Sequence, residues 1–136
     1  MTKFYAVFDT NVLVSALMSQ RIDSPTVMLV NLVLSGRIVL LYNEEILEEY
    51  VDVLNRAKFH FSNERIAAIL DMVRLGLPMS RVESSEVFPD PDDRVFYEVA
   101  LSKDGAYMVT GNQRHFPKTT IVVSPAEMIN IINDSE

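Results

Sequence analysis

The sequence predicts an α/β fold, a three-layer α/β/α sandwich with a central, mostly parallel sheet. Short apolar runs that suit buried strands lie at residues 4–8, 38–42, 106–110 and 120–124. Helical patterns lie between most of these runs, and such alternation is typical of parallel strand pairing. No repeat, low-complexity tract or linker is visible, so we expect a single domain over residues 1–136.

The expected helices begin and end at recognisable residues. They span residues 11–18, 25–34, 44–56, 63–75, 91 to about 103, and a last stretch that includes 128–133, with a weak extended piece at 79–83. Asn43, Ser62 (or Asn63) and Asp90 suit N-cap positions, and Gly36 suits the position just after a helix. Ser124-Pro125-Ala126-Glu127 has the pattern of a capping box that opens the last helix.

The composition excludes several kinds of site. The chain contains no cysteine, so disulfides and thiolate metal sites are impossible, and any metal needs oxygen ligands or His60 and His115. The first residues lack the apolar stretch of a signal peptide, and the longest apolar runs are far shorter than the ~20 residues that span a bilayer. We therefore expect a cytoplasmic protein with no membrane association.

The net charge of −7 constrains the partners of the protein. Non-specific binding to nucleic acid depends on Lys and Arg side chains that neutralise phosphates, which an acidic chain has in short supply. Carboxylates clustered around divalent cations would reconcile such a chain with a polyanionic substrate. An acidic surface also suits a basic partner protein.

Polar residues follow the expected strands at the points where those strands end. They are Asp9 after the first strand, Glu44, Glu45, Glu48 and Glu49 after the second, Asp90, Asp92 and Asp93 further along, and Thr110 to Asn112 after the third. In open parallel sheets, binding sites form outside the carboxyl ends of the strands. Carboxylates gathered there repel one another, and a hard cation such as Mg²⁺ removes that cost.

Four short motifs in this order resemble the PIN-domain family over nearly the whole chain. They are Asp9-Thr10-Asn11 after an apolar strand, a Glu within ILEEYVDVLNR, an Asp within DPDDRVFYEVAL, and Thr110-Gly111-Asn112. The stretches DTNVLVSAL, DPDDRVF and VTGNQRHFP are similar to putative toxins of toxin–antitoxin pairs. The resemblance implies a Mg²⁺- or Mn²⁺-dependent endoribonuclease that hydrolyses single-stranded RNA. It also implies an antitoxin partner and a homodimer.

The resemblance and helical geometry together select the expected site residues. The catalytic set is Asp9, Glu49, Asp93 and Asn112, of which the three acids are the expected metal ligands. Glu49 lies at the margin of the apolar face of its helix, and Asp93 precedes Phe96 by three residues, as in the family pattern. The fourth position is commonly Asp in the family, so Asn112 lowers the charge and the expected metal affinity.

Each of these residues also has a simpler interpretation. Asp9 and Asp90 could cap helices, and we expect capping to be the chief role of Asp90. Asp92 is either an auxiliary ligand or solvated. Glu44, Glu45 and Glu48 suit a solvated face. The hydroxyls of Thr10 and Thr110 could orient ligand carboxylates, and Asn11 would support the turn after Asp9.

Two basic groups accompany the acids. Arg114, His115 and Lys118 could contact RNA phosphates beside the site, with His115 at the surface rather than catalytic. Arg56, Lys58, His60 and Arg65 form a second group near a helix end, and such groups are usually solvated charge.

Other enzyme classes fit the same residues less well. A haloacid-dehalogenase-like phosphatase needs a second acid two residues after the first, and that position is Asn11. A receiver domain needs an acidic pair near the end of the first strand, which is absent. Neither a Walker loop nor a Rossmann glycine pattern is present. A catalytically weak PIN-like binding module for nucleic acid or protein remains the alternative, and Asn112 favours it.

Overall fold

The strands form one parallel sheet. The computed structural model describes residues 2–135. Its strands are β1 (Phe4–Phe8), β2 (Ile38–Tyr42), β3 (Leu77–Pro78), β4 (Tyr107–Val109) and β5 (Val122–Val123). Their order is β3-β2-β1-β4-β5, and every neighbouring pair is parallel. The expected α/β class is confirmed, and the sheet is wholly rather than mostly parallel.

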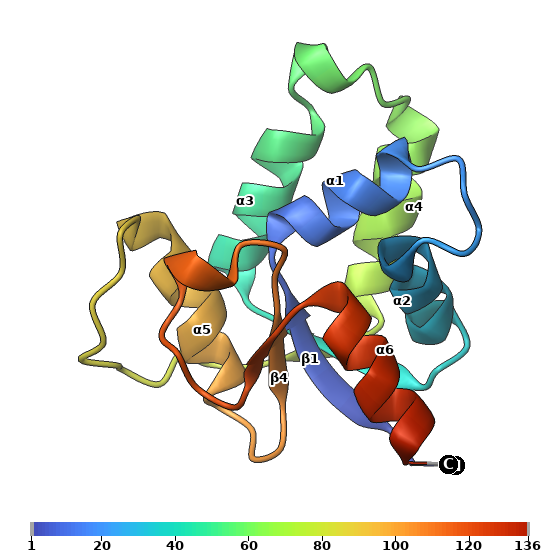
Figure 1. Ribbon diagram of the computed structural model, residues 1–136. Helices are drawn as coiled ribbons and strands as arrows, with labels where there is room; N and C mark the ends of the chain where they lie inside the picture. The colour runs from blue at the N-terminus through green and yellow to red at the C-terminus, as the bar shows by residue number, and fades with distance from the viewer. Residues whose placement is uncertain (1, 136) are drawn as a thin grey trace.

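Helices enclose this sheet. They are α1 (Thr10–Met18), α2 (Pro25–Leu34), α3 (Glu44–Leu54), α4 (Asn63–Arg74), α5 (Arg94–Ala100) and α6 (Pro125–Asp134), with short 3₁₀ turns η1 (Ala57–Phe59), η2 (Pro91–Asp93) and η3 (Gln113–His115). In Figure 1, β1 and β4 lie between α5 on one side and α2 and α6 on the other, which gives the three expected layers. Within residues 2–135, no helix is long and apolar enough to cross a membrane.

Local capping chemistry sets most helix boundaries. Asn43 Oδ1 accepts a hydrogen bond from the Ile46 N–H at 2.9 Å, and Ser62 Oγ accepts one from Arg65 at 3.2 Å. The capping box at Ser124 is formed in full. After α2, Gly36 adopts a φ of +86°, where its N–H reaches the Val33 carbonyl at 3.1 Å. Only a residue without a Cβ adopts this backbone at little cost.

Three expected boundaries were wrong. Helix α3 ends at Leu54 rather than at residue 56, because Arg56 is extended and starts η1. The chain before α5 makes a 3₁₀ turn first, and α5 ends at Ala100 rather than near residue 103. An extended piece was expected at 79–83, but the strand that forms is β3 at Leu77–Pro78, which pairs with β2. A Cβ on Gly76 would lie 2.0 Å from the Leu40 carbonyl oxygen, so this glycine lets the chain pass directly beside β2.

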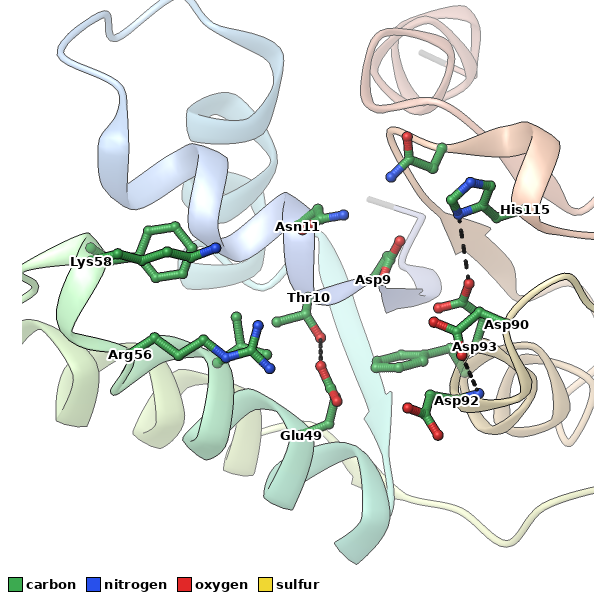
Figure 2. Close-up of a pocket in the computed structure, with 14 residues that line it drawn as sticks. Asp9, Thr10, Asn11, Glu49, Arg56, Lys58, Asp90, Asp92, Asp93 and His115 are labelled. Atoms are coloured by element: carbon green, nitrogen blue, oxygen red, sulfur yellow. Dashed lines mark hydrogen bonds and ion pairs between the residues drawn. The ribbon is translucent and has the colours of Figure 1, made fainter.

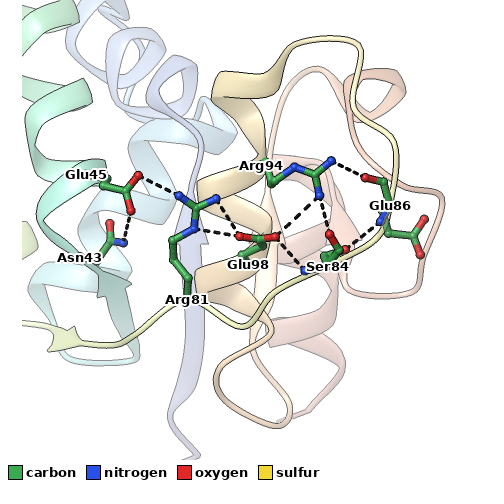
Figure 3. A network of polar contacts seen from close by, with 7 residues as sticks. All are labelled: Asn43, Glu45, Arg81, Ser84, Glu86, Arg94 and Glu98. Carbon is green, nitrogen blue, oxygen red and sulfur yellow. Dashed lines mark hydrogen bonds and ion pairs between the residues drawn. The ribbon is translucent and has the colours of Figure 1, made fainter.

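An ion pair between the buried Glu98 and the exposed Arg81 fixes the irregular segment between β3 and η2 (Figure 3). Glu98 on α5 is buried and accepts hydrogen bonds from Arg81 Nε and from the Ser84 N–H, both at 2.8 Å. Burial raises the pKa of Glu98, but these donors outweigh it and hold the pKa below its usual value. Arg81 also donates to Glu45 on α3 at 2.8 Å, so Glu45 is not simply solvated as expected.

We predict that Glu98→Ala lowers the free energy of unfolding by about 1.5–3 kcal/mol, because it removes the charged acceptor of the Arg81 and Ser84 donors. Chemical denaturation at neutral pH measures this change. Glu86→Ala is the matched control: this exposed glutamate lies in the same segment, and its side chain has no polar partner within residues 2–135. The control should change stability by at most about 0.5 kcal/mol. Equal effects of the two substitutions would contradict the role given to Glu98.

Candidate active site

Asp9 lies where β1 meets β4. Phe8 pairs with Val109 in register, and the Asp9 N–H donates to the Val109 carbonyl at 2.9 Å. The side chain of Asp9 is buried and makes no capping hydrogen bond; instead it accepts one from Thr110 Oγ1 at 2.8 Å. Burial raises its pKa, although the Thr110 hydroxyl, the Thr10 N–H and the charge of His115 oppose the shift. Asp9 is therefore held by strand pairing rather than used as a helix cap.

Glu49 reaches the same place from α3. It is half-buried, at the margin of the apolar face as expected, and accepts a hydrogen bond from Thr10 Oγ1 at 3.3 Å. Burial raises its pKa more than this hydrogen bond lowers it. The next residue, Tyr50, is buried and donates a hydrogen bond to the Phe8 carbonyl. Helix α3 is thus fixed to the end of β1, which holds Glu49 close to Asp9.

Asp93 comes from η2 on the other side of Asp9. Burial together with the nearby charges of Asp9 and Asp90 raises its pKa to about 6. His115 Nδ1 lies 3.9 Å from its carboxylate, a distance too long for a hydrogen bond. Asp90 is the expected N-cap: its carboxylate accepts from the Asp92 N–H at 2.9 Å.

These residues line one cleft of about 340 Å³ (Figure 2). Its acidic residues are Asp9, Glu49, Asp90, Asp92 and Asp93, and its neutral polar residues include Thr10, Asn11 and Asn112. Thr110 is fully buried behind Asp9, and its hydroxyl also accepts a hydrogen bond from the Asn112 N–H at 2.9 Å. The structure therefore brings the four expected catalytic residues to one cleft; their catalytic roles stay a prediction.

The basic residues are arranged differently from what we expected. Arg114 and Lys118 line a separate hollow together with Phe116 and Pro117, whereas His115 faces the acidic cleft. The expected patch of three is therefore divided. Arg56 and Lys58, expected to be solvated charge, line the cleft opposite Asp90, Asp92 and Asp93 (Figure 2). In the sequence, the only sign that these two side chains line the cleft is that both closely follow the helix that carries Glu49.

The donor set suits a hard divalent cation. All its acidic groups are carboxylates, and the raised pKa values of Asp9, Glu49 and Asp93 show that the chain leaves their charge poorly compensated. Within residues 2–135, however, no three His, Asp or Glu side chains are close enough to hold one ion together. Mg²⁺ commonly keeps several waters and takes only one or two carboxylates directly. The residues therefore fit a largely hydrated ion.

We predict that Asp93→Asn stabilises the metal-free protein at pH 7.5. Because the folded-state pKa of Asp93 is raised to about 6, ionisation costs stability as the pH rises from the unfolded value of 3.8 through 6. The variant should gain at most about 3 kcal/mol at pH 7.5, at ~1.36 kcal/mol per pKa unit, and nothing at pH 3.5. Thermal unfolding in EDTA at both pH values measures the gain. Asp104→Asn, on an exposed turn, should show no such dependence.

Comparisons with known proteins place the chain in a family. Searches of curated proteins and of solved structures found no match. A family model described as PIN domain matches residues 5–114, which include Asp9, Glu49, Asp93 and Asn112. This match covers most of the chain, and the parallel sheet with acids at its carboxyl edge agrees with it. The chain therefore belongs to the PIN-domain family.

Proposed function

We propose that the protein is a metal-dependent endoribonuclease that hydrolyses single-stranded RNA, and that it is the toxin of a toxin–antitoxin pair. PIN domains are generally nucleases. The observation that carries the proposal is that Asp9, Glu49 and Asp93, from three separate elements, line one cleft and each have a raised pKa. Perturbed carboxylates gathered in a cleft are the expected mark of a catalytic site.

Each residue has a distinct part in this proposal. Asp9 and Asp93 would hold a Mg²⁺ or Mn²⁺ ion, with Glu49 as a third ligand directly or through water. A bound divalent cation supplies positive charge beside the scissile phosphate and acidifies a water molecule for attack. Asn112 would position that water through its amide. Thr110 and Thr10 orient the carboxylates of Asp9 and Glu49 by the hydrogen bonds described above.

A second candidate is a PIN-like binding module with little catalytic activity. Two observations favour it: the amide of Asn112 replaces a carboxylate, and no three-ligand cluster exists within the described residues 2–135. Such a module would bind nucleic acid or protein in the same cleft. It would bind RNA without cleaving it when a cation is present, which separates it from the nuclease.

The proposed partners follow from charge and from the family. The net charge of −7 and the five acids of the cleft suit a small antitoxin that inserts a basic side chain among them. Pairing of two copies as a homodimer is the arrangement common among relatives.

We predict cleavage of a labelled single-stranded RNA that requires Mg²⁺ or Mn²⁺ and stops in EDTA. Asp9→Asn should lower the rate about 100-fold or more, because each ~1.36 kcal/mol of lost transition-state stabilisation is tenfold. Thr110 can still donate to the new amide oxygen, so the fold should be kept. Asp104→Asn serves as the control and should cleave as the wild type does.

Equal cleavage by the wild type and Asp9→Asn would show that the activity comes from a contaminating enzyme. If the pure protein binds RNA in EDTA but cleaves no RNA or DNA with either metal, the binding module is correct and the nuclease proposal is wrong.

Asn112→Asp tests the missing carboxylate. An added negative charge beside Asp9 should tighten cation binding, so we expect the metal concentration for half-maximal cleavage to fall about tenfold. Cleavage rates at increasing Mn²⁺ concentration measure this midpoint. Asn11→Asp, at the same cleft but outside the expected ligand set, is the comparison variant. A midpoint that stays constant in Asn112→Asp would show that residue 112 does not contribute to metal binding.

A further inference from the structure

The two walls of the cleft differ in charge, although Glu49 lies on the same wall as Arg56, whose charge lowers the Glu49 pKa in part. Asp90, Asp92 and Asp93 lie on one side, and Arg56 and Lys58 lie on the other (Figure 2). A polyanion that enters this cleft meets favourable charge chiefly at the second wall. Both basic side chains are exposed, and within residues 2–135 Lys58 has no carboxylate partner.

The ion pair of Arg56 with Asp52 is weak. The Arg56 guanidinium pairs with Asp52 at 3.1 Å, and both side chains are well exposed. Exposed pairs of this kind contribute little to stability, so the guanidinium can turn toward a phosphate at little cost.

The same wall carries a pair of stacked aromatic rings. Phe59 lines the cleft, and its ring stacks on that of Phe61, with centroids 5.4 Å apart and planes inclined by 9°. Lys58 Nζ lies 5.1 Å from the Phe59 centroid, and Arg65 Cζ lies 5.7 Å from the Phe61 centroid. Both rings are half-buried and pack against the hydrophobic core, so they form a fixed surface rather than a mobile one.

The residue between the two rings has an unusual backbone. His60 has a φ of +55°, and no other non-glycine residue within 2–135 has a positive φ. Residues held in this region cost free energy and are found preferentially at functional sites. Here the left-handed residue ends η1 at the point where Phe59 and Phe61 stack.

We infer that Arg56, Lys58 and Phe59 form a nucleotide subsite for a single strand, in which a base stacks on Phe59 and the two cations contact the adjacent phosphates. The inference rests on the substrate class proposed above. The base takes the place of the Lys58 ammonium on the ring face, and the ammonium then meets the phosphate of that nucleotide. Only an unpaired strand offers a free base face, and every base has one, so this subsite selects single strands without reading sequence.

Binding of a fluorescein-labelled, mixed-sequence RNA of about 12 nucleotides, measured by anisotropy in EDTA, tests the subsite without cleavage. Phe59→Leu keeps an apolar side chain against the core, and we expect it to weaken binding about tenfold with an unchanged salt dependence. Lys58→Ala should instead reduce the slope of log affinity against log salt by about 0.7, as loss of one phosphate contact does. Phe59→Trp, which keeps an aromatic ring, should bind the RNA as tightly as the wild type does, unlike Phe59→Leu.

The chain offers a matched control at the other end of the sheet. Lys103 Nζ lies 4.3 Å from the Tyr5 ring centroid, which is the same cation-over-ring geometry. Lys103→Ala and Tyr5→Leu should leave both the affinity and the salt slope unchanged. Thermal unfolding of every variant shows whether a loss of binding reflects a loss of fold.

The outcomes separate the subsite from the proposed function. If the wild type binds RNA but folded Phe59→Leu binds equally well, or Lys103→Ala reduces the salt slope as much as Lys58→Ala, the subsite is wrong and the nuclease proposal stands. The subsite is also wrong if Phe59→Leu weakens the binding of duplex RNA as much as it weakens the binding of single-stranded RNA. If the wild type binds no single strand in EDTA, the subsite is wrong, and the cleavage assay with Mg²⁺ or Mn²⁺ decides the substrate class separately.

Discussion

The hydrogen bond from Thr110 to Asp9 depends on a single constraint, the register of two neighbouring parallel strands. Phe8 pairs with Val109, so the next residue of each strand leaves the sheet at the same point. One is a carboxylate and the other a hydroxyl, and they meet at 2.8 Å in the protein interior. A slip of one residue in this pairing would turn Asp9 to the other face and separate the two. The remaining acids of the cleft are arranged around this fixed carboxylate.

The other two acids are fixed to the same strand end by separate means. The Tyr50 hydroxyl donates to the Phe8 carbonyl, which ties α3 and therefore Glu49 to β1. On the opposite side, the Glu98–Arg81 ion pair holds α5 to the segment that leads into η2 and Asp93. The fold thus holds together carboxylates that repel one another. Contacts outside the cleft offset this repulsion. One of them is the pairing of Glu98 with its donors Arg81 and Ser84.

Much of this arrangement could be predicted from the sequence because it depends on local rules. Asn43 and Ser124 cap the helices they precede, and the helical period alone places Glu49 at the margin of a buried face. Parallel topology then brings the strand ends together. The ion pair of Glu98 with Arg81 could not be predicted, because Arg81 lies in an irregular segment without periodicity. The same limit applies at the 3₁₀ turns, whose direction decides which basic side chains face the cleft.

In the proposed nuclease, the partial separation of charge within the cleft would reconcile an acidic chain with a polyanion. Cations placed among the carboxylates would pair with them, lower their pKa values and compete with a metal for them. Across the cleft, Arg56 lowers the pKa of Glu49 only in part, and the raised pKa values of Asp9 and Asp93 are kept. In the proposed nuclease, Arg56 and Lys58 would attract the phosphates. In the proposed nuclease, a strand attracted to the basic side chains and cut at the acids would cross the cleft in a defined position. The charge pattern of the cleft would therefore determine where the RNA backbone lies relative to the acids, independently of base sequence.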